Sequence, residues 1–330
     1  MKKLNTDLEQ AMIRKIEHLF FCDNCKRMGV FNNVKLEPEE LLDLSLEDID
    51  TSVDFLDMKL AFPSYINAIT GGSYISENIN RKLAMLSREF DIPVMTGSMS
   101  VFLKYGELKS YLPLKNTYKV IVNLSARNTV SELLKCAEIM DTKYVCLHVN
   151  TAQELIQPEG DNSFKNETKN IKEAVNEFGE NLIVKAVGQG FSKGTIKRLC
   201  DLGVKNIDIS GAGGTDFSEI ERMRTVKNFD AFPSIDTETS LAYLKEFDVY
   251  KIASGGIDTP LDMIKAIKVG ADITASAYYY LMLTKMDKYA AVDKIKNDRL
   301  EFKKLMLLLG KKSLKELGGD QDYKSFTTTV

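Results

Sequence analysis

Residues 182–214, LIVKAVGQGFSKGTIKRLCDLGVKNIDISGAGG, decide the fold of this chain. An apolar run at Leu182–Val187 ends in a glycine turn, and a helical pattern follows over Thr195–Leu202. A second apolar run, Asn206–Ser210, ends in another glycine turn. This order of strand, helix and strand predicts two parallel strands joined by a crossover helix.

The same unit recurs along most of the chain. The strand-like runs are Ser64–Ile69, Pro93–Thr96, Lys119–Leu124, Tyr144–Val149, Leu182–Val187, Asn206–Ser210, Asp230–Pro233 and Tyr250–Ala253. Helical patterns between them cover Asn78–Phe90, Val130–Met140, Ile171–Phe178, Thr195–Leu202, Glu219–Val226, Thr237–Glu246 and Pro260–Lys268. Eight such units in about 250 residues predict a TIM (β/α)8 barrel. The competing doubly wound sheet usually carries a GxGxxG turn after its first strand, and this chain has none there.

No Pro/Gly/Ser-rich linker interrupts the series, which favours a single domain. We expect a helical N-terminal extension at about 1–60, the barrel at about 61–285 and a helical C-terminal tail at about 286–330. The first segment, MKKLNTDLEQAMIRKIEHLFF, carries charges every few residues, so it predicts an amphipathic helix rather than a signal sequence or a membrane span.

Composition narrows the function classes. The 330 residues include 44 basic and 47 acidic side chains, for a net charge of −3, and they form no basic face for nucleic acid or for an anionic membrane. The five cysteines follow no dense spacing, which favours a reducing cytoplasm. Cys22 and Cys25 form a lone CxxC without a second pair at zinc spacing, so a metal or redox site there has weak support.

The stretch His148–Phe164, HVNTAQELIQPEGDNSF, places polar groups directly after a predicted strand. In a barrel the carboxyl ends of the strands face the active site, so these groups are candidates for catalysis. An ordinary polar loop is the alternative for the segment taken alone.

Glycines also follow most of the predicted strands. They allow backbone N–H groups to approach an anion, and the clearest case is Ala253–Ala277, ASGGIDTPLDMIKAIKVGADITASA. Lys185 lies inside an apolar strand and needs an electron-rich partner. A Schiff-base lysine, a lysine beside a flavin ring and a snorkelling surface lysine all remain open for it.

Seven segments together carry a resemblance to a known family. They are RKIEH (14–18), YINAITGG (65–72), TGS (96–98), HVNTAQELIQPEGD (148–161), VKAVGQGFS (184–192), VKNIDISGAGGTDF (204–217) and ASGGIDTPLDMIKAIKVGAD (253–272). In this order they resemble the type 2 isopentenyl-diphosphate isomerases, flavin-dependent enzymes that interconvert isopentenyl and dimethylallyl diphosphate.

The resemblance implies an FMN at the mouth of the barrel and a Mg²⁺ ion on the substrate diphosphate. The implied FMN contacts are Ala68, Ile69, Thr70, Gly71, Ser98, Asn123, Lys185, Ser210, Thr215, Gly255, Gly256, Ile257, Ala277 and Tyr278. The implied substrate contacts are Arg14, Lys15, Ser98, Met99, Ser100, Lys104 and Gln153, with His148, Asn150 and Gln153 as catalytic residues and Glu154 as the metal ligand. It also implies a homotetramer or a larger homo-oligomer.

The implied reaction is a 1,3-allylic proton shift. The amide of Gln153 has no useful pKa, so it suits orientation or proton relay, and reduced FMN is left as the acid/base. Because the shift consumes no electrons, NADPH would serve only to reduce the flavin. Many relatives carry Arg or His shortly after the TGS segment, whereas this chain has Met99 and Ser100, and Lys104 is the nearest cation that could replace it.

Two other classes stay open. One is an FMN oxidoreductase of the 2-hydroxy-acid or dihydroorotate type, which needs a base aimed at the substrate carbon. The only histidines are His18 and His148, and only His148 follows a predicted barrel strand. The other is a non-catalytic prenyl-diphosphate binder.

Overall fold

The computed structural model describes residues 2–22, 30–158, 160, 162–225 and 232–318. Eight parallel strands close into a barrel in the order β10-β3-β4-β5-β6-β7-β8-β9, which confirms the predicted TIM barrel. The strands are β3 (Ser64–Ile66), β4 (Val94–Met95), β5 (Val120–Ser125), β6 (Val145–Val149), β7 (Leu182–Ala186), β8 (Asn206–Asp208), β9 (Tyr250–Ala253) and β10 (Ile273–Ser276).

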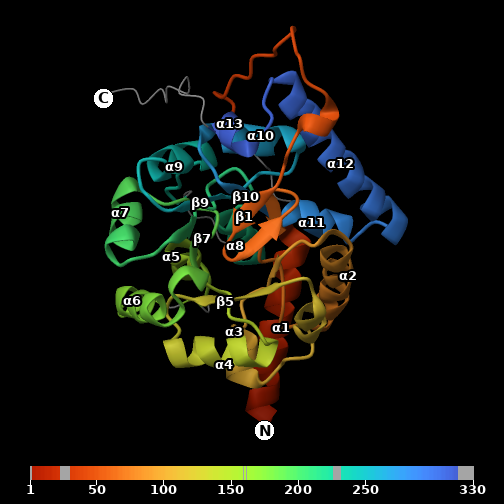
Figure 1. The fold of residues 1–330 in the computed structure, drawn as a ribbon. Coiled ribbons are helices and arrows are strands. Elements are labelled where there is room, and N and C mark those ends of the chain that lie inside the picture. Colours follow the sequence, from red (N-terminus) through yellow and green to blue (C-terminus); the bar gives the residue numbers. More distant parts are fainter. Residues whose placement is uncertain (1, 23–29, 159, 161, 226–231, 319–330) are drawn as a thin grey trace.

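Helices form a ring around the strands (Figure 1). They are α2 (Tyr74–Phe90), α4 (Val130–Met140), α6 (Glu167–Phe178), α7 (Lys193–Asp201), α9 (Thr237–Leu244), α10 (Pro260–Val269), α11 (Tyr278–Leu283), α12 (Lys288–Leu308) and α13 (Leu314–Gly318). Local sequence sets several of their starts. Thr129 and Glu132 form a capping box at α4, and Thr259 and Asp262 form one at α10, which satisfies N–H groups at the first turn.

Both faces of the barrel strands are buried. One face points into the interior of the barrel, and the other packs against the surrounding helices. All residues of β5 and β7 are buried, which explains their near-continuous apolar sequences. The register places His148 beside Lys185 and Lys185 beside Asp208 on neighbouring strands. Three polar groups therefore share one level of the barrel near its carboxyl end.

One predicted strand is wrong, and one real strand lies outside the predicted set. Of the expected strand at 230–233, residues 230 and 231 lie outside the described residues, and Phe232 and Pro233 belong to no strand. Proline lacks the N–H that a central strand must donate. Tyr250–Ala253 is therefore the seventh strand, and β10 is the eighth, pairing with both β9 and β3 to close the barrel.

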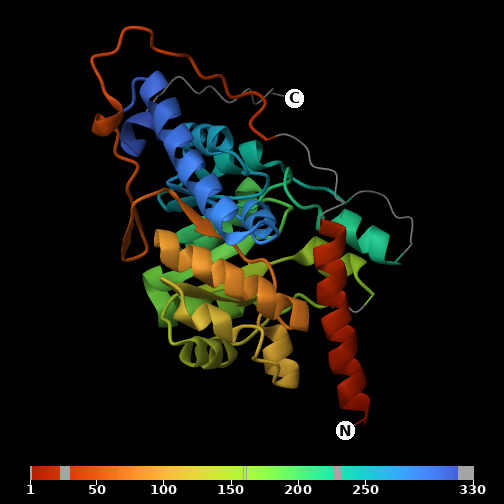
Figure 2. The same ribbon diagram turned by 90° about the vertical axis from the view of Figure 1, so that its right-hand side faces the viewer.

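The segment before β3 reaches both ends of the barrel. Helix α1 (Lys2–Cys22) stands at one end, while the chain over residues 30–60 runs around to the other (Figure 2). There β1 (Val53–Phe55) and β2 (Met58–Leu60) form an antiparallel hairpin. The Phe55 ring stacks on Tyr65 of β3, with centroids 5.1 Å apart, so the hairpin covers the amino ends of the strands.

Three short helices lie in the loops at the carboxyl end: α3 (Ser100–Tyr105), α5 (Thr151–Ile156) and α8 (Phe217–Thr225). Three single turns, η1 (Leu46–Asp48), η2 (Leu112–Asn116) and η3 (Gly179–Asn181), complete the connections. Helix α1 packs against α8, α3 and α2, so the N-terminal helix becomes a wall at this end of the barrel.

Candidate functional site

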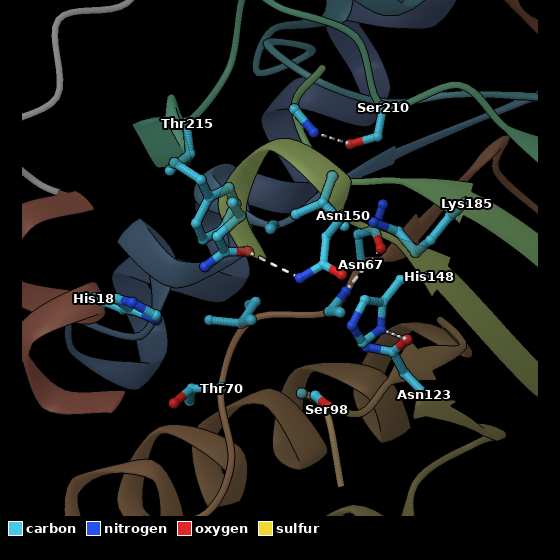
Figure 3. A pocket seen from close by; sticks show the side chains of 18 of the residues that line it. His18, Asn67, Thr70, Ser98, Asn123, His148, Asn150, Lys185, Ser210 and Thr215 are labelled. Carbon is cyan, nitrogen blue, oxygen red and sulfur yellow. Dashed lines mark hydrogen bonds between the residues drawn. The ribbon is translucent and has the colours of Figure 1, made fainter. Parts of the chain in front are cut away.

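The carboxyl ends of the strands, α1 and the short loop helices enclose a cavity of about 440 Å³. This size falls in the range of small-molecule and cofactor sites. Figure 3 shows Asn123, His148 and Lys185 together on one wall, with His18 of α1 across the cavity. Most of the predicted site residues line it: Arg14, Lys15, Ala68, Ile69, Thr70, Ser98, Ser100, Lys104, Asn123, His148, Asn150, Gln153, Glu154, Lys185, Ser210, Thr215, Gly255, Gly256, Ala277 and Tyr278.

Three predicted site residues are not among the lining residues: Gly71, Met99 and Ile257. Met99 is fully buried and Ile257 is 2% exposed, so both side chains pack into the core. Gly71 lies directly against the ring of Tyr111, and a Cβ at this position would be only 2.1 Å from the ring. The glycine is therefore needed for packing, whatever its backbone contributes to a ligand.

His148 is held in a neutral state. Its Nδ1 lies 2.9 Å from Oδ1 of Asn123, and the tautomer protonated on Nδ1 satisfies this contact. Burial, together with the charges of Lys185, Lys15 and Arg127, lowers the pKa of His148 from 6.5 to about 3. At neutral pH the ring offers Nε2 to a ligand as a hydrogen-bond acceptor.

Lys185 is 5% exposed and donates from Nζ to the carbonyl of Ala186, at 2.8 Å. On the neighbouring strand β8, the fully buried carboxylate of Asp208 accepts from Asn67 Nδ2 at 2.9 Å and from Ser254 Oγ at 2.6 Å. Asn67 and Ser254 line the cavity, so Asp208 fixes the orientation of two of its polar groups. Sequence reasoning missed these three residues, although all of them stand within the segments that carry the family resemblance.

A second polar group surrounds Glu154 on α5. Asn150 donates from Nδ2 to Glu154 Oε1 at 3.0 Å and to Gln153 Oε1 at 3.4 Å. Arg127, from the loop after β5, forms an ion pair with the same Oε1 of Glu154. Sequence reasoning also missed Arg127, and the signal that could have found it is a basic residue three positions after the end of the predicted strand Lys119–Leu124.

Helix α1 contributes Arg14, Lys15 and His18 to the cavity. Burial and the neighbouring Arg14 lower the pKa of Lys15 to about 7, against an opposing effect from Glu154. His18 Nε2 lies 2.8 Å from the buried Oε1 of Glu221 on α8. Since Arg224 also contacts Glu221, and its Nε lies 3.0 Å from Glu17 Oε2, ionic contacts join α1 to α8 beside the site.

The cavity is electropositive. Among the described residues that line it, the basic side chains are Arg14, Lys15, Lys104, Arg127 and Lys185, and the acidic ones are Glu154 and Asp258. This excess of cations favours a ligand with several negative charges.

Glycines bring two of the loops at the mouth into close contact. A Cβ at Gly255 would lie 2.3 Å from the carbonyl oxygen of Gly211, and one at Gly256 would lie 2.4 Å from that of Gly213. Both Gly255 (φ 95°) and Gly256 (φ 82°) also adopt the left-handed conformation. The loops after β8 and β9 therefore meet backbone to backbone.

Two other expectations concern metals and membranes. No group of three or more His, Cys, Asp or Glu side chains with metal-binding geometry occurs in the described part of the chain. For the CxxC, Cys25 lies outside the described residues. None of the helices within the described ranges is long and apolar enough to cross a membrane.

Comparisons with known proteins agree with this architecture. Residues 113–323 match the family described as FMN-dependent dehydrogenase. Among solved structures, a mutant flavocytochrome b2 with benzoylformate has a TM-score of 0.62 at 17% identity, covering 87% of this chain and 74% of that one. A mutant mandelate oxidase with a monooxide FMN adduct has a TM-score of 0.59 at 15% identity, covering 94% and 98%. These structures share the fold.

Curated relatives are more similar in sequence. A protein of Listeria monocytogenes serotype 4b, named isopentenyl-diphosphate delta-isomerase, is 33% identical and aligns over 92% of this chain and 89% of its own length. A protein of Limosilactobacillus reuteri subsp. reuteri with the same name is 35% identical, over 92% of both chains. The chain belongs to the FMN-dependent isopentenyl-diphosphate delta-isomerase family.

Proposed function

We propose that this protein interconverts isopentenyl diphosphate and dimethylallyl diphosphate by a 1,3-allylic proton shift. The observation that carries the proposal is the convergence, around one cavity, of neutral hydrogen-bonding groups with an excess of cations. His148, Asn150 and Gln153 form the neutral set, and Arg14 and Lys104 belong to the cationic one. This arrangement suits a substrate that is apolar at its reacting end and multiply charged at the other.

The cavity also suits FMN. Its lining offers Lys185 as a cation, Asn123, Thr70 and Ser98 as hydrogen-bonding groups, and the exposed backbone of the glycine loops. Buried cations and backbone N–H groups are the donors that a flavin ring and its phosphate require. We propose that Lys185 lies against the polar edge of the ring, and that Gly255, Gly256 and Ala277 hold the phosphate. When bound and reduced, FMN supplies the acid and base of the proton shift.

The diphosphate end is proposed to lie near α1 and α5. Arg14 offers a planar fork and Lys15 a compact charge, and anionic phosphate would favour the protonated form of Lys15. Glu154 is the proposed Mg²⁺ ligand. The donor set fits, because Mg²⁺ in such sites takes one or two carboxylates and completes its shell with phosphate oxygens and water.

The remaining residues orient the substrate. Neutral His148 and the amides of Asn150 and Gln153 present polar atoms to the cavity without adding charge to it. Holding the allylic carbons in one place relative to the proton donor supplies much of the rate, because position and orientation lower the barrier. We assign Gln153 to orientation or relay, since an amide does not titrate near neutral pH.

An anaerobic assay with isopentenyl diphosphate, FMN, Mg²⁺ and NADPH tests the proposal. We expect dimethylallyl diphosphate to form with NADPH oxidised only once per flavin. Gln153→Ala should slow turnover while the Mg²⁺ dependence is kept, and Lys193→Gln, at a surface ion pair with Glu246, serves as a control. Oxidation of one NADPH per product would identify an oxidoreductase, and no product under reducing conditions would leave only a binding protein.

A further inference from the structure

The ion pair between Arg127 and Glu154 occupies the carboxylate proposed to bind the metal. It is a sheltered pair, with 22% of the Arg127 side chain and 9% of the Glu154 side chain exposed. Asn150 donates to the same Oε1 at 3.0 Å. A divalent cation that binds this oxygen must therefore displace a guanidinium or share the oxygen with it.

The backbone that carries Arg127 is fixed. Asn170 of α6 donates from Nδ2 to the carbonyls of Ala126 and Arg127, each at 3.0 Å. The Nε of Arg127 lies 3.2 Å from Oγ of Ser125, at the end of β5. A long side chain on a held loop can exchange one partner for another without moving the barrel.

We infer that Arg127 is a substrate-positioning residue that neutralises Glu154 in the metal-free site and transfers to the substrate diphosphate when a divalent cation binds Glu154. The inference rests on the proposed function, because it takes Glu154 as the metal ligand. Arg127 and Glu154 are both charged groups that line the same cavity.

The exchange has a physical reason. A divalent cation beside a guanidinium on one carboxylate meets like-charge repulsion in a sheltered site, so the metal alone binds weakly. A diphosphate supplies the anionic oxygens that Arg127 needs once it leaves Glu154, and a fork of N–H groups suits phosphate. Arg127 thereby favours the metal and the diphosphate together over the metal alone.

The test uses FMN-loaded protein freed of metal with a chelator, and two separate titrations. After the chelator is removed, binding of Mn²⁺ alone is followed by electron paramagnetic resonance, and binding of inorganic pyrophosphate is followed by calorimetry in saturating Mg²⁺. Arg127→Gln should bind Mn²⁺ about tenfold more tightly than the unmodified protein and pyrophosphate about tenfold more weakly. Opposite changes in the two affinities would not arise from a purely structural role.

Lys104→Gln is the matched control, because it removes one positive charge from the same lining and keeps the pair between Arg127 and Glu154. It should weaken pyrophosphate binding and change Mn²⁺ affinity less than threefold. If Arg127→Gln fails to fold, as judged by circular dichroism, Arg127→Met should still raise Mn²⁺ affinity, because it keeps the length of the side chain and removes its charge.

Three results overturn the inference: equal or weaker Mn²⁺ binding in the Arg127 variant, equal tightening in Lys104→Gln, or unchanged pyrophosphate binding. The Glu154→Gln variant distinguishes failure of the Arg127 exchange from failure of the proposed function. Mn²⁺ binding that survives in Glu154→Gln removes Glu154 as the metal ligand and with it the exchange. An isomerase that passes the Glu154→Gln test but shows no effect at Arg127 keeps the function and loses only the exchange.

Discussion

The two ends of the barrel are covered by parts of the same N-terminal segment in opposite ways. At the amino end the β1–β2 hairpin packs apolar side chains on the strands, with Phe55 fully buried and Met58 5% exposed. At the carboxyl end α1 covers a cavity lined by charged and polar groups. Close packing of apolar side chains contributes to the stability of the fold. Charged and polar groups around a cavity do not, so a requirement of function rather than of stability explains them. The amino end thus stabilises the fold, and the carboxyl end performs the chemistry.

Phe55→Ala is the strongest test of the amino end. We expect a loss of about 3–5 kcal/mol in the free energy of unfolding, because the substitution removes a fully buried ring stacked on Tyr65. Urea unfolding measures the loss. The FMN content of the protein that remains folded should not change, and loss of FMN from folded protein would contradict the division between the two ends.

Lys185→Met is the corresponding change at the carboxyl end. We expect the isomerase rate to fall by about 10²–10³, since the buried cation that we propose stabilises developing charge is lost. The melting temperature should stay the same or rise, because the substitution also removes a buried charge. Anaerobic kinetics and calorimetry measure the two effects, and a large drop in melting temperature with normal kinetics would place Lys185 among the structural residues.

Acid should destabilise the protein through His148. Its pKa of about 3 in the fold lies below the unfolded value of 6.5, so below pH 6.5 the unfolded chain takes up a proton that the folded chain does not. Stability is therefore lost as the pH falls from 6.5 towards 3, by about 2 kcal/mol between pH 7 and pH 5 for this group. His148→Asn should unfold with a shallower dependence on pH over this window, and equal slopes for the two proteins would refute the assignment.

The smallest expected effect is at Lys104. If its ammonium contacts the diphosphate, Lys104→Ala should raise KM about tenfold and leave kcat nearly unchanged, because an interaction of about 1.5 kcal/mol with an unreacting group is lost. Arg14→Ala should show the same pattern more strongly. An unchanged KM in Lys104→Ala, together with a raised KM in Ser100→Ala, would assign the contact to the hydroxyl instead.

Most of the fold could be predicted because its signals are local. Glycine turns and helical periodicity mark each unit, and the helix expected at Val130–Met140 has the bounds found in α4. The strand β10 was missed because its sequence, Ile273–Ser276, is short and dominated by small or polar residues. Its place in the barrel is set by pairing with β9 and β3, which no local pattern reveals.

The position of the cavity was also predictable, since a parallel barrel gathers all the strand ends on one face. Contacts between loops were not predictable from the sequence. Arg127 and Glu154 come from different loops, and His18 and Glu221 lie 203 residues apart. Met99 follows a motif of the site, yet its side chain points into the core, because the short helix α3 that begins after it sets the direction of the chain.

The contacts between α1 and α8 also bear on the order of events during synthesis. Some 200 residues separate Glu17 and His18 from their partners on α8, so a ribosome produces α1 long before α8, one of the helices on which it packs, exists. Contacts between such distant segments form late, because the chain between them must first be ordered. Until then α1 is an amphipathic helix that lacks its contacts with α8, a segment on which a chaperone can act. The barrel should therefore form before the cavity is complete, and FMN should be retained only after α1 has docked.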